Sequence, residues 1–387
     1  MKVLSKDDPE YRQCSLTVMD NIADPDIRFD SQGICNYYYD YKKVESEYVY
    51  TGKTAEEKIS RLVDQIKKAG KGKRYDCLIG LSGGVDSTYV AYLVKQLGLR
   101  PLAVHLDNGW DSELAVKNVE NIITKLGFDL YTLVVNWEEF KDIQLSYLKA
   151  SVVDIEVVSD HAIFATMYKL AKKHDTGYII SGTNIVTEYI MPPSWIYQKM
   201  DFSNLKDIHS RYGKIKLKTY PVLDFKKHVY YSAVLQLNWI SILNYVPYNK
   251  QQVKEIIAKE LDWRDYGGKH FESLFTKFYQ AYILPEKFRI DKRKAHLSTL
   301  ISSGQISREE ALKQLEQPLY PEDQLKVDME YVLKKFGLTH HEFDAIMKLP
   351  PRSHEEFKTD RHLKESYMNL LRKTEPIRKV VKRTILR

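Results

Sequence analysis

Hydrophobic positions between residues 75 and 225 follow two alternating spacings, one typical of buried strands and one typical of helices. Short apolar runs predict strands at residues 76–81, 101–106, 130–135 and 178–181. Helical spacing predicts helices at residues 87–97, 113–126 and 160–173. Strands that alternate with helices are typical of a parallel sheet covered on both faces. We therefore expect an α/β fold whose ligands bind at the carboxyl ends of the strands.

The two ends of the chain follow other patterns. Residues 1–50 carry turn-forming sequences without a clear hydrophobic period, which predicts a small irregular N-terminal unit. The α/β domain is expected over residues 51–226, beginning with a helix at 54–68. Strand patterns stop after residue 226, so residues 227–387 are expected to form an all-helical C-terminal region that binds substrate or a partner and ends in a basic tail.

Composition narrows the class of protein. Hydrophobic residues make up 43% of the 387 positions and charged residues 29%, which excludes collagen-like and wholly disordered chains. A net charge of +7 suits anionic ligands without requiring nucleic acid. No apolar run approaches the roughly 18 residues of a membrane helix, and the N-terminus lacks the apolar region of a signal peptide. Three cysteines exclude a disulfide scaffold and fit a reducing compartment, so we expect a cytoplasmic protein.

The strongest chemical pattern is a hexapeptide between the first strand and the next helix. Adjacent glycines let the backbone approach a ligand closely, and the N-terminus of the following helix attracts anions. Serine hydroxyls at both ends add hydrogen-bond donors for phosphate oxygens. An aspartate in such a turn needs a cation, so Asp86 predicts Mg²⁺ between carboxylate and phosphate. An ordinary glycine-containing turn is the alternative. The residues are Ser82, Gly83, Gly84, Val85, Asp86 and Ser87.

Neither a Walker A sequence nor a G-x-G-x-x-G fingerprint occurs, and the hexapeptide resembles the PP-loop of the ATP-pyrophosphatase superfamily. The resemblance implies an adenine nucleotide alpha hydrolase-like fold and cleavage of ATP to AMP and pyrophosphate. It also implies that the segment after the second strand holds adenosine, where His105 and Asp107 stand. The segment after the fourth strand is expected to bind ribose or α-phosphate through Gly182, Thr183 and Asn184.

Glu188 follows that segment and is expected to share the magnesium ion with Asp86, because NAD synthetases carry a metal-binding glutamate in a similar stretch. For Glu188 and for Asp107, a helix cap or a surface carboxylate is an equally good interpretation, since acidic residues are common in strand–helix loops.

Longer segments resemble the N-acetyl sugar amidotransferases, at residues 14–36, 184–213 and 267–301. The resemblance covers nearly the whole chain apart from the first ten residues and the basic tail. It implies conversion of an acetamido group on a bacterial surface-glycan precursor, for lipopolysaccharide O-antigen or nonulosonic acids, into an acetamidino group. The implied inputs are ATP, Mg²⁺ and ammonia, and the implied intermediate is an adenylated imidate that releases AMP and pyrophosphate.

The source of ammonia is expected to be a separate glutaminase partner, similar to the glutaminase–cyclase pair of histidine biosynthesis. Residue 2 is a lysine, so the chain lacks the N-terminal cysteine nucleophile of one glutaminase class, and Cys77 lies within the first strand.

Candidate residues on the substrate side come from the C-terminal half. Lys269 and His270 follow a double glycine and are expected to act in catalysis, with His270 moving a proton near neutral pH. A helix start with solvated side chains is the alternative. Candidate substrate-binding residues are Trp195, Lys277, Lys292 and Arg293; the last two suit a nucleotide-sugar diphosphate, although an aromatic core and a solvated helix explain this set as well.

The N-terminal unit departs from the pattern of the family. Many members have two Cys-x-x-Cys pairs, which build a closed zinc site. Here Cys14 and Cys35 are present, but Thr17 and Tyr38 stand in the second position of each pair. Two thiolates do not complete a tetrahedral structural site, so we expect no zinc and a degenerate knuckle held by packing.

Two other functions stay open at this point. A tRNA-modifying PP-loop enzyme would suit the basic tail and the net charge, although sulfur-transferring relatives need reactive cysteines. A non-enzymatic nucleotide-binding partner would have no need of Asp86 and Glu188. The identity of the sugar, its linkage to a nucleotide and the oligomeric state do not follow from the sequence.

Overall fold

The computed structural model describes residues 6–268, 271–370 and 372, and within them five strands form one parallel sheet. The spatial order is β3-β2-β1-β4-β5. The chain therefore leaves β1 in one direction toward β2 and β3 and later returns to its other side at β4. Loops that diverge in this way leave a crevice at the carboxyl ends of the strands. The strands are β1 (Cys77–Gly80), β2 (Pro101–Asp107), β3 (Asp129–Val134), β4 (Tyr178–Ser181) and β5 (Asn238–Ser241).

Both faces of the central strands are buried, which is why these strands read as continuous apolar runs. Cys77 and Ile79 of β1 pack into the core formed with α2, α3, α4 and α10. Leu78 points to the opposite face, where it packs with residues of α6. The helices around the sheet are α2 (Gly52–Ala69), α3 (Val85–Gln96), α4 (Glu113–Leu126), α6 (Val157–Lys173) and α10 (Lys250–Leu261).

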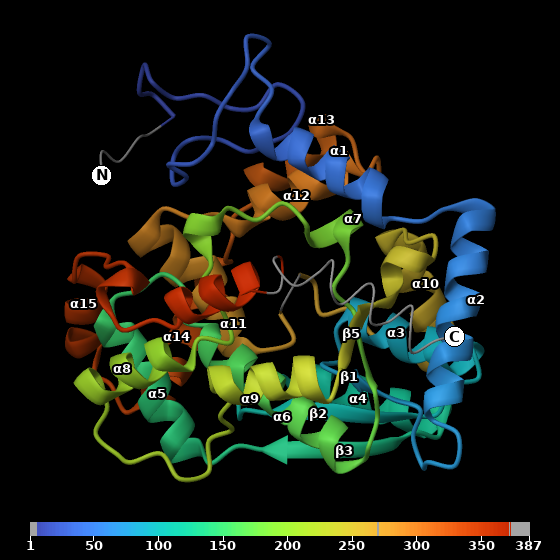
Figure 1. Ribbon diagram of the computed structural model, residues 1–387. Helices are drawn as coiled ribbons and strands as arrows, with labels where there is room; N and C mark the ends of the chain where they lie inside the picture. The colour runs from blue at the N-terminus through green and yellow to red at the C-terminus, as the bar shows by residue number, and fades with distance from the viewer. Residues whose placement is uncertain (1–5, 269–270, 371, 373–387) are drawn as a thin grey trace.

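A helical body lies beside the sheet (Figure 1). Trp110, Phe278 and Phe343 are among the fully or almost fully buried side chains of its core. Its longer helices are α5 (Trp137–Ala150), α8 (Phe202–Tyr212), α12 (Lys292–Ser302), α13 (Arg308–Glu316), α14 (Glu322–Phe336) and α15 (His340–Lys348). Short helical segments among the described residues are α7 (Ile185–Glu188), η1 (Pro193–Trp195), α9 (Phe225–Val229), η2 (Tyr230–Val234), η3 (Ile242–Tyr245), α11 (Leu274–Phe278), η4 (Tyr279–Phe288) and η5 (His354–Glu356).

The expected parallel α/β sheet is confirmed, but two details of the sequence prediction are wrong. β5 lies beyond residue 226 and pairs in parallel with β4, so the sheet is not complete at that boundary. β5 is four residues long and only partly buried at the edge of the sheet, which explains its weak pattern. Residues 36–48 form the helix α1 (Asn36–Tyr48) rather than irregular chain, and its buried residues Tyr37 and Tyr41 are one turn apart.

The rest of the N-terminal unit is a set of short loops that lies over α12 and α13 (Figure 1). Cys14 and Cys35 are buried free thiols, and the Cys35 N–H donates to the Cys14 sulfur at 3.2 Å. The Thr17 hydroxyl, in place of a further cysteine, lies 3.8 Å from the Cys35 sulfur. Among the residues that the structure describes, no group of three or more His, Cys, Asp or Glu side chains is arranged to hold a metal ion.

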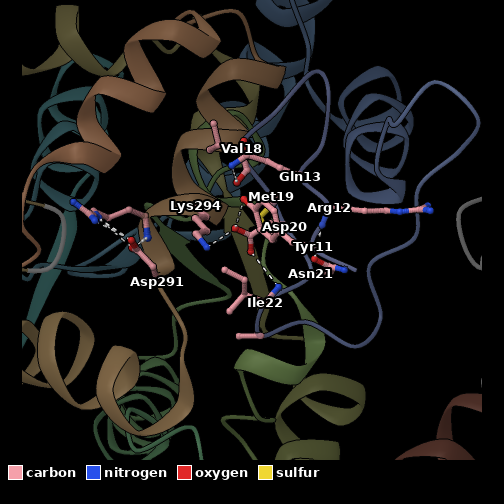
Figure 2. Close-up of polar contacts among 12 residues, drawn as sticks. Tyr11, Arg12, Gln13, Val18, Met19, Asp20, Asn21, Ile22, Asp291 and Lys294 are labelled. Atoms are coloured by element: carbon pink, nitrogen blue, oxygen red, sulfur yellow. Dashed lines mark hydrogen bonds and ion pairs between the residues drawn. The ribbon is translucent and has the colours of Figure 1, made fainter. Parts of the chain in front are cut away.

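A buried ion pair connects this unit to α12. Asp20 is 2% exposed, and Figure 2 shows the Lys294 ammonium donating to its carboxylate. The same carboxylate accepts from the Ile22 N–H at 3.3 Å and from the Tyr11 hydroxyl at 3.4 Å. The Arg308 guanidinium adds hydrogen bonds to backbone carbonyls of the unit, among them that of Thr17 at 3.0 Å. Packing and charge therefore hold the unit in place.

Replacing Lys294 by Met is expected to lower the free energy of unfolding by about 3 kcal/mol, because the substitution leaves the Asp20 carboxylate buried without its cation. The measurement is chemical denaturation of the wild type and the variant. Lys313→Met on the neighbouring helix α13 is the control, since this side chain is exposed. A Lys294→Met effect no larger than that of the control would contradict the stabilising role of the pair.

Candidate functional site

Two adjoining cavities lie at the carboxyl edge of the sheet. The larger one, about 580 Å³, is called the main cavity, and its wall includes His105, Glu156 and Lys292. The smaller one, about 400 Å³, is called the loop cavity, and its wall includes Asp86 and Lys250. The two cavities share a wall made of Ser82, Ser87, Thr183, Glu188 and Glu272. The segments that follow β1 and β4 therefore both face this space, as the order of the strands requires.

The turn at residues 82–87 has a backbone shape that depends on glycine. Gly83 has φ of 82°, and a Cβ atom there would lie 2.8 Å from the Ala115 carbonyl oxygen. Gly84 is the N-cap of α3, so the free N–H groups of that helix begin at the loop. The Trp263 indole N–H donates to the Gly83 carbonyl at 2.8 Å and fixes the turn from outside. The Ser82 and Ser87 hydroxyls lie 3.1 Å apart on the shared wall.

The segment after β4 packs directly on this turn. A Cβ atom on Gly182 would lie 3.0 Å from the carbonyl carbon of Asp86 and 3.1 Å from the Ser87 nitrogen. Only glycine allows this close approach without displacing the turn at residues 82–87. The Thr183 hydroxyl, on the shared wall, hydrogen-bonds the Ser181 and Ser241 hydroxyls at 2.6 and 2.8 Å.

Two carboxylates suited to a magnesium ion lie close to one tyrosine. The Tyr248 hydroxyl donates to Asp86. Burial and then Asp86 raise the pKa of Tyr248, and Glu188 adds to the rise, so both carboxylates act on the same hydroxyl. Mg²⁺ is bound in proteins by one or two carboxylates together with phosphate oxygens and water. Asp86 and Glu188 therefore fit a magnesium ion carried in with phosphate.

His105 is buried near the end of β2, and each of its ring nitrogens contacts an oxygen atom. Its Nδ1 lies 2.9 Å from the Leu81 carbonyl oxygen, and its Nε2 lies 3.2 Å from a carboxylate oxygen of Asp111. Burial opposes the charged imidazole, but the hydrogen bonds to Asp111 and Leu81 outweigh it and raise the pKa of His105. Asp107 instead lines a separate hollow and accepts from the Gly109 N–H at 2.9 Å.

Paired charges line another part of the main cavity, called its polar end. The Lys292 ammonium lies 2.6 Å from Glu156, and the Lys199 ammonium lies 3.1 Å from Asp160 and 2.8 Å from the buried Asp154. Burial raises the pKa of Asp160, although Lys199 opposes the rise, and Asp160 lines the main cavity.

Several predicted residues lie elsewhere. Asn184 caps α7 by accepting from the Thr187 N–H at 2.9 Å and does not line either cavity. Trp195 is 2% exposed and donates its indole N–H to the Ala23 carbonyl, so it packs in the core. Lys277 is buried 3.0 Å from Asp328. Arg293 lines a third hollow, shared with Lys292, and lies 2.9 Å from Asp291.

Lys269 and His270 lie outside the described residues. The structure adds cavity residues that the sequence did not single out, because they come from helices or loops with no motif of their own. They are Asp111, Glu156, Lys199, Lys250, Lys254, Tyr266, Glu272 and Gln280.

Two family models match different parts of the chain. A model described as NAD synthase matches residues 55–207, which carry the first four strands and the loop. A model described as LPS biosynthesis protein WbpG-like, C-terminal domain, matches residues 272–372, which form much of the helical body. The chain therefore combines a part similar to NAD synthase with a part similar to the WbpG-like C-terminal domain. The WbpG-like and PP-loop parts thus meet at the two cavities, since residues from both line the shared wall.

The relatives described next have low sequence identity to this chain. An uncharacterized protein of Methanocaldococcus jannaschii is 23% identical over 80% of this chain and 95% of its own length. A tRNA-specific 2-thiouridylase of Fusobacterium nucleatum is 24% identical over 47% of this chain and 50% of its own length. An NH3-dependent NAD synthetase structure from Campylobacter jejuni has 16% identity and a TM-score of 0.29, covering 57% of this chain and 84% of the other.

Among the described helices, none is long and apolar enough to cross a membrane.

Replacing Asp111 by Asn is expected to lower the pKa of His105, because the carboxylate favours the charged imidazole. A folded-state pKa above the unfolded value stabilises the protein below about pH 6.5, and this contribution is lost as pH rises through the folded value. The stability difference between wild type and variant should therefore be larger at pH 6 than at pH 9. Imidazole NMR titration measures the shift directly, and an unchanged or higher pKa in the variant would contradict the assigned pair.

Proposed function

We propose that the protein is an ATP-dependent amidotransferase that converts an acetamido group of a bacterial surface-glycan precursor into an acetamidino group. Ammonia comes from a separate glutaminase partner, and the reaction takes place in the cytoplasm. One observation carries the proposal: a single cavity runs from the 82–87 loop to the polar end at Glu156 and Lys292. That geometry suits a nucleotide at one end and a hydrogen-bonding acceptor at the other.

The two cavities suit ATP with its phosphates at the 82–87 loop and its adenosine in the main cavity. The loop at 82–87 and the N-terminus of α3 offer N–H groups to the phosphates. Asp86 and Glu188 would hold Mg²⁺, which when bound neutralises charge on the phosphates. The adenosine lies along the main cavity beside His105, where Leu106, Ile163 and Met167 supply apolar surface for a base.

The chemistry follows from the weakness of an amide as an electrophile. The acetamido oxygen attacks the α-phosphorus of ATP, the bond from that phosphorus to the bridging oxygen breaks, and pyrophosphate leaves with the bonding electrons. Ammonia then adds to the imidate carbon. AMP departs with the former amide oxygen, and the added nitrogen loses its extra proton. Alignment of the amide oxygen with phosphorus is the main contribution of the protein.

The paired charges bind the acceptor and accept a proton. Hydroxyl groups of a sugar find donors and acceptors at Lys292, Glu156 and Gln280, whose amide lies 2.8 Å from Glu156. Asp160 faces the same cavity with a raised pKa, which suits a carboxylate that accepts the proton lost by the added nitrogen. Lys292 and Glu156 are largely buried, which limits water near the imidate.

A tRNA-modifying activity is the second candidate, favoured by the similarity to a protein named as a tRNA-specific 2-thiouridylase. Sulfur transfer through the protein needs a thiolate that reaches the substrate. Cys14, Cys35 and Cys77 are buried, and none of the three lines the main or the loop cavity. The amidotransferase is therefore the better-supported function.

The test supplies ATP, Mg²⁺ and ammonium chloride with a panel of acetamido nucleotide sugars and nonulosonic acids. Pyrophosphate release should depend on one sugar, and mass spectrometry should find oxygen replaced by NH in the product. Asp86→Ala should lower kcat/KM at least about 100-fold, since it removes a carboxylate that would hold Mg²⁺ on the phosphates.

Asp323→Ala is the control, because Asp323 is also in the first turn of a helix but is exposed on α14. Release that depends on bulk tRNA and on no sugar would overturn the amidotransferase and favour the second candidate.

A further inference from the structure

The strand β3 forms one edge of the sheet and is more exposed than the inner strands. It stands first in the order β3-β2-β1-β4-β5, so β2 is its one neighbour among the described strands. Each of its six residues is exposed or half-buried, and Figure 1 shows it as the lowest strand of the sheet. Leu130 and Val134 are 38% and 68% exposed, although both are apolar. A strand of largely apolar sequence is therefore open along one side.

The backbone groups on the outer side of β3 have no hydrogen-bond partner among the described residues. The Val135 N–H donates to the Asp107 carbonyl of β2 at 3.0 Å, so the odd-numbered residues direct their backbone groups toward β2. This direction alternates along a strand, and the N–H and C=O groups of Leu130, Thr132 and Val134 therefore point outward. They form a row of donors and acceptors that a further strand can pair with.

β3 lacks the features by which sheet edges usually avoid such pairing, which include lysine or proline in the strand and a bulge. Its sequence, DLYTLV, contains neither residue, and its register with β2 runs without a break from Asp129 to Val134. The charged side chains near its two ends are paired: Arg74 lies 2.9 Å from Asp129, and Lys141 lies 2.9 Å from Glu138. Because each pair is neutral, neither end repels a second copy of the strand.

The sequence of β3 is complementary to itself when two copies run antiparallel with Thr132 opposite Thr132. On the face of α4, where Leu130 and Thr132 line a hollow beside that helix, Leu130 then lies opposite Val134 of the second copy. On the other face, Tyr131 lies opposite Leu133. Cross-strand pairs of apolar and aromatic side chains stabilise a sheet. In this register every outward N–H and C=O group of both strands also gains a partner.

We propose that two copies of this chain associate through β3, antiparallel about Thr132, and so join their sheets into one. A two-fold axis relates the copies, and the same surface of each chain forms both sides of the contact. Leu133 also lines the main cavity, so the contact adjoins that cavity in each chain. Because the joined strands run in opposite directions, the carboxyl edges of the two sheets, and with them the main cavities, lie on opposite sides of the dimer.

The first experiment measures the mass of the full chain by light scattering during size-exclusion chromatography, over a series of concentrations. The wild type is expected at twice the 45.4 kDa of one chain. Val134→Lys is expected at the mass of one chain, because it puts a charge opposite the apolar Leu130 of the second copy. Val327→Lys on α14 is the matched control and should keep the doubled mass, since Val327 is also 68% exposed.

The second experiment tests the register with single cysteines, in a chain whose own three cysteines are buried. Thr132→Cys should form a disulfide-linked dimer on oxidation with copper phenanthroline, because the two Cα atoms of a directly opposed pair are about 5.5 Å apart. Val134→Cys alone should not, because its copy lies about 13 Å away along the strand. A mixture of Leu130→Cys and Val134→Cys chains should crosslink.

Three results would overturn the proposal. They are a wild type at the mass of one chain at every concentration, a folded Val134→Lys chain that keeps the doubled mass, and crosslinking of Val134→Cys alone without crosslinking of Thr132→Cys. If circular dichroism shows that Val134→Lys is not folded, Thr132→Lys takes its place, since it sets two like charges opposite each other. No readout depends on ATP or on a sugar, so this proposal and the proposed function stand or fall separately.

Discussion

The close packing of Gly182 against the backbone at Asp86 and Ser87 is the contact on which the rest of the site depends. It brings the loops after β1 and β4 together at the point where the order of the strands reverses. Because Gly182 has no Cβ atom, the turn at residues 82–87 and the segment that leads to Glu188 can share one wall of the cavities. That contact sets the positions of Asp86 and Glu188, the two carboxylates suited to a magnesium ion.

The helical body and the N-terminal unit supply what the sheet lacks. Lys292 of α12 is paired with Glu156 next to α6, so the polar end of the main cavity joins the sheet to the helical body. The same helix α12 holds the N-terminal unit through Lys294 and Asp20. One helix therefore carries part of the cavity wall and supports the N-terminal unit, in which the Cys14 sulfur accepts from the Cys35 N–H and the Cys35 sulfur contacts the Thr17 hydroxyl.

The sequence alone predicted those elements that depend on short-range patterns of hydrophobic residues and on the order of the strands. The first four strands, the helix after the hexapeptide and the placement of Asp86 and Glu188 at one edge follow from hydrophobic period and strand order. β5 was missed because an edge strand of four residues buries too little to give a pattern. Trp195 and Lys277 were assigned to substrate because residue type does not reveal burial, whereas Lys250 and Asp160 reach the cavities only through tertiary packing.

The most direct test of the account follows one oxygen atom. The acetamido sugar selected by the pyrophosphate assay is prepared with ¹⁸O in its acetamido carbonyl and converted with ATP and ammonia. If the amide oxygen attacks the α-phosphorus in the cavity beside the 82–87 loop, the ¹⁸O must appear in AMP and in no other product. Label in pyrophosphate or inorganic phosphate, or AMP formed without label, would contradict the account.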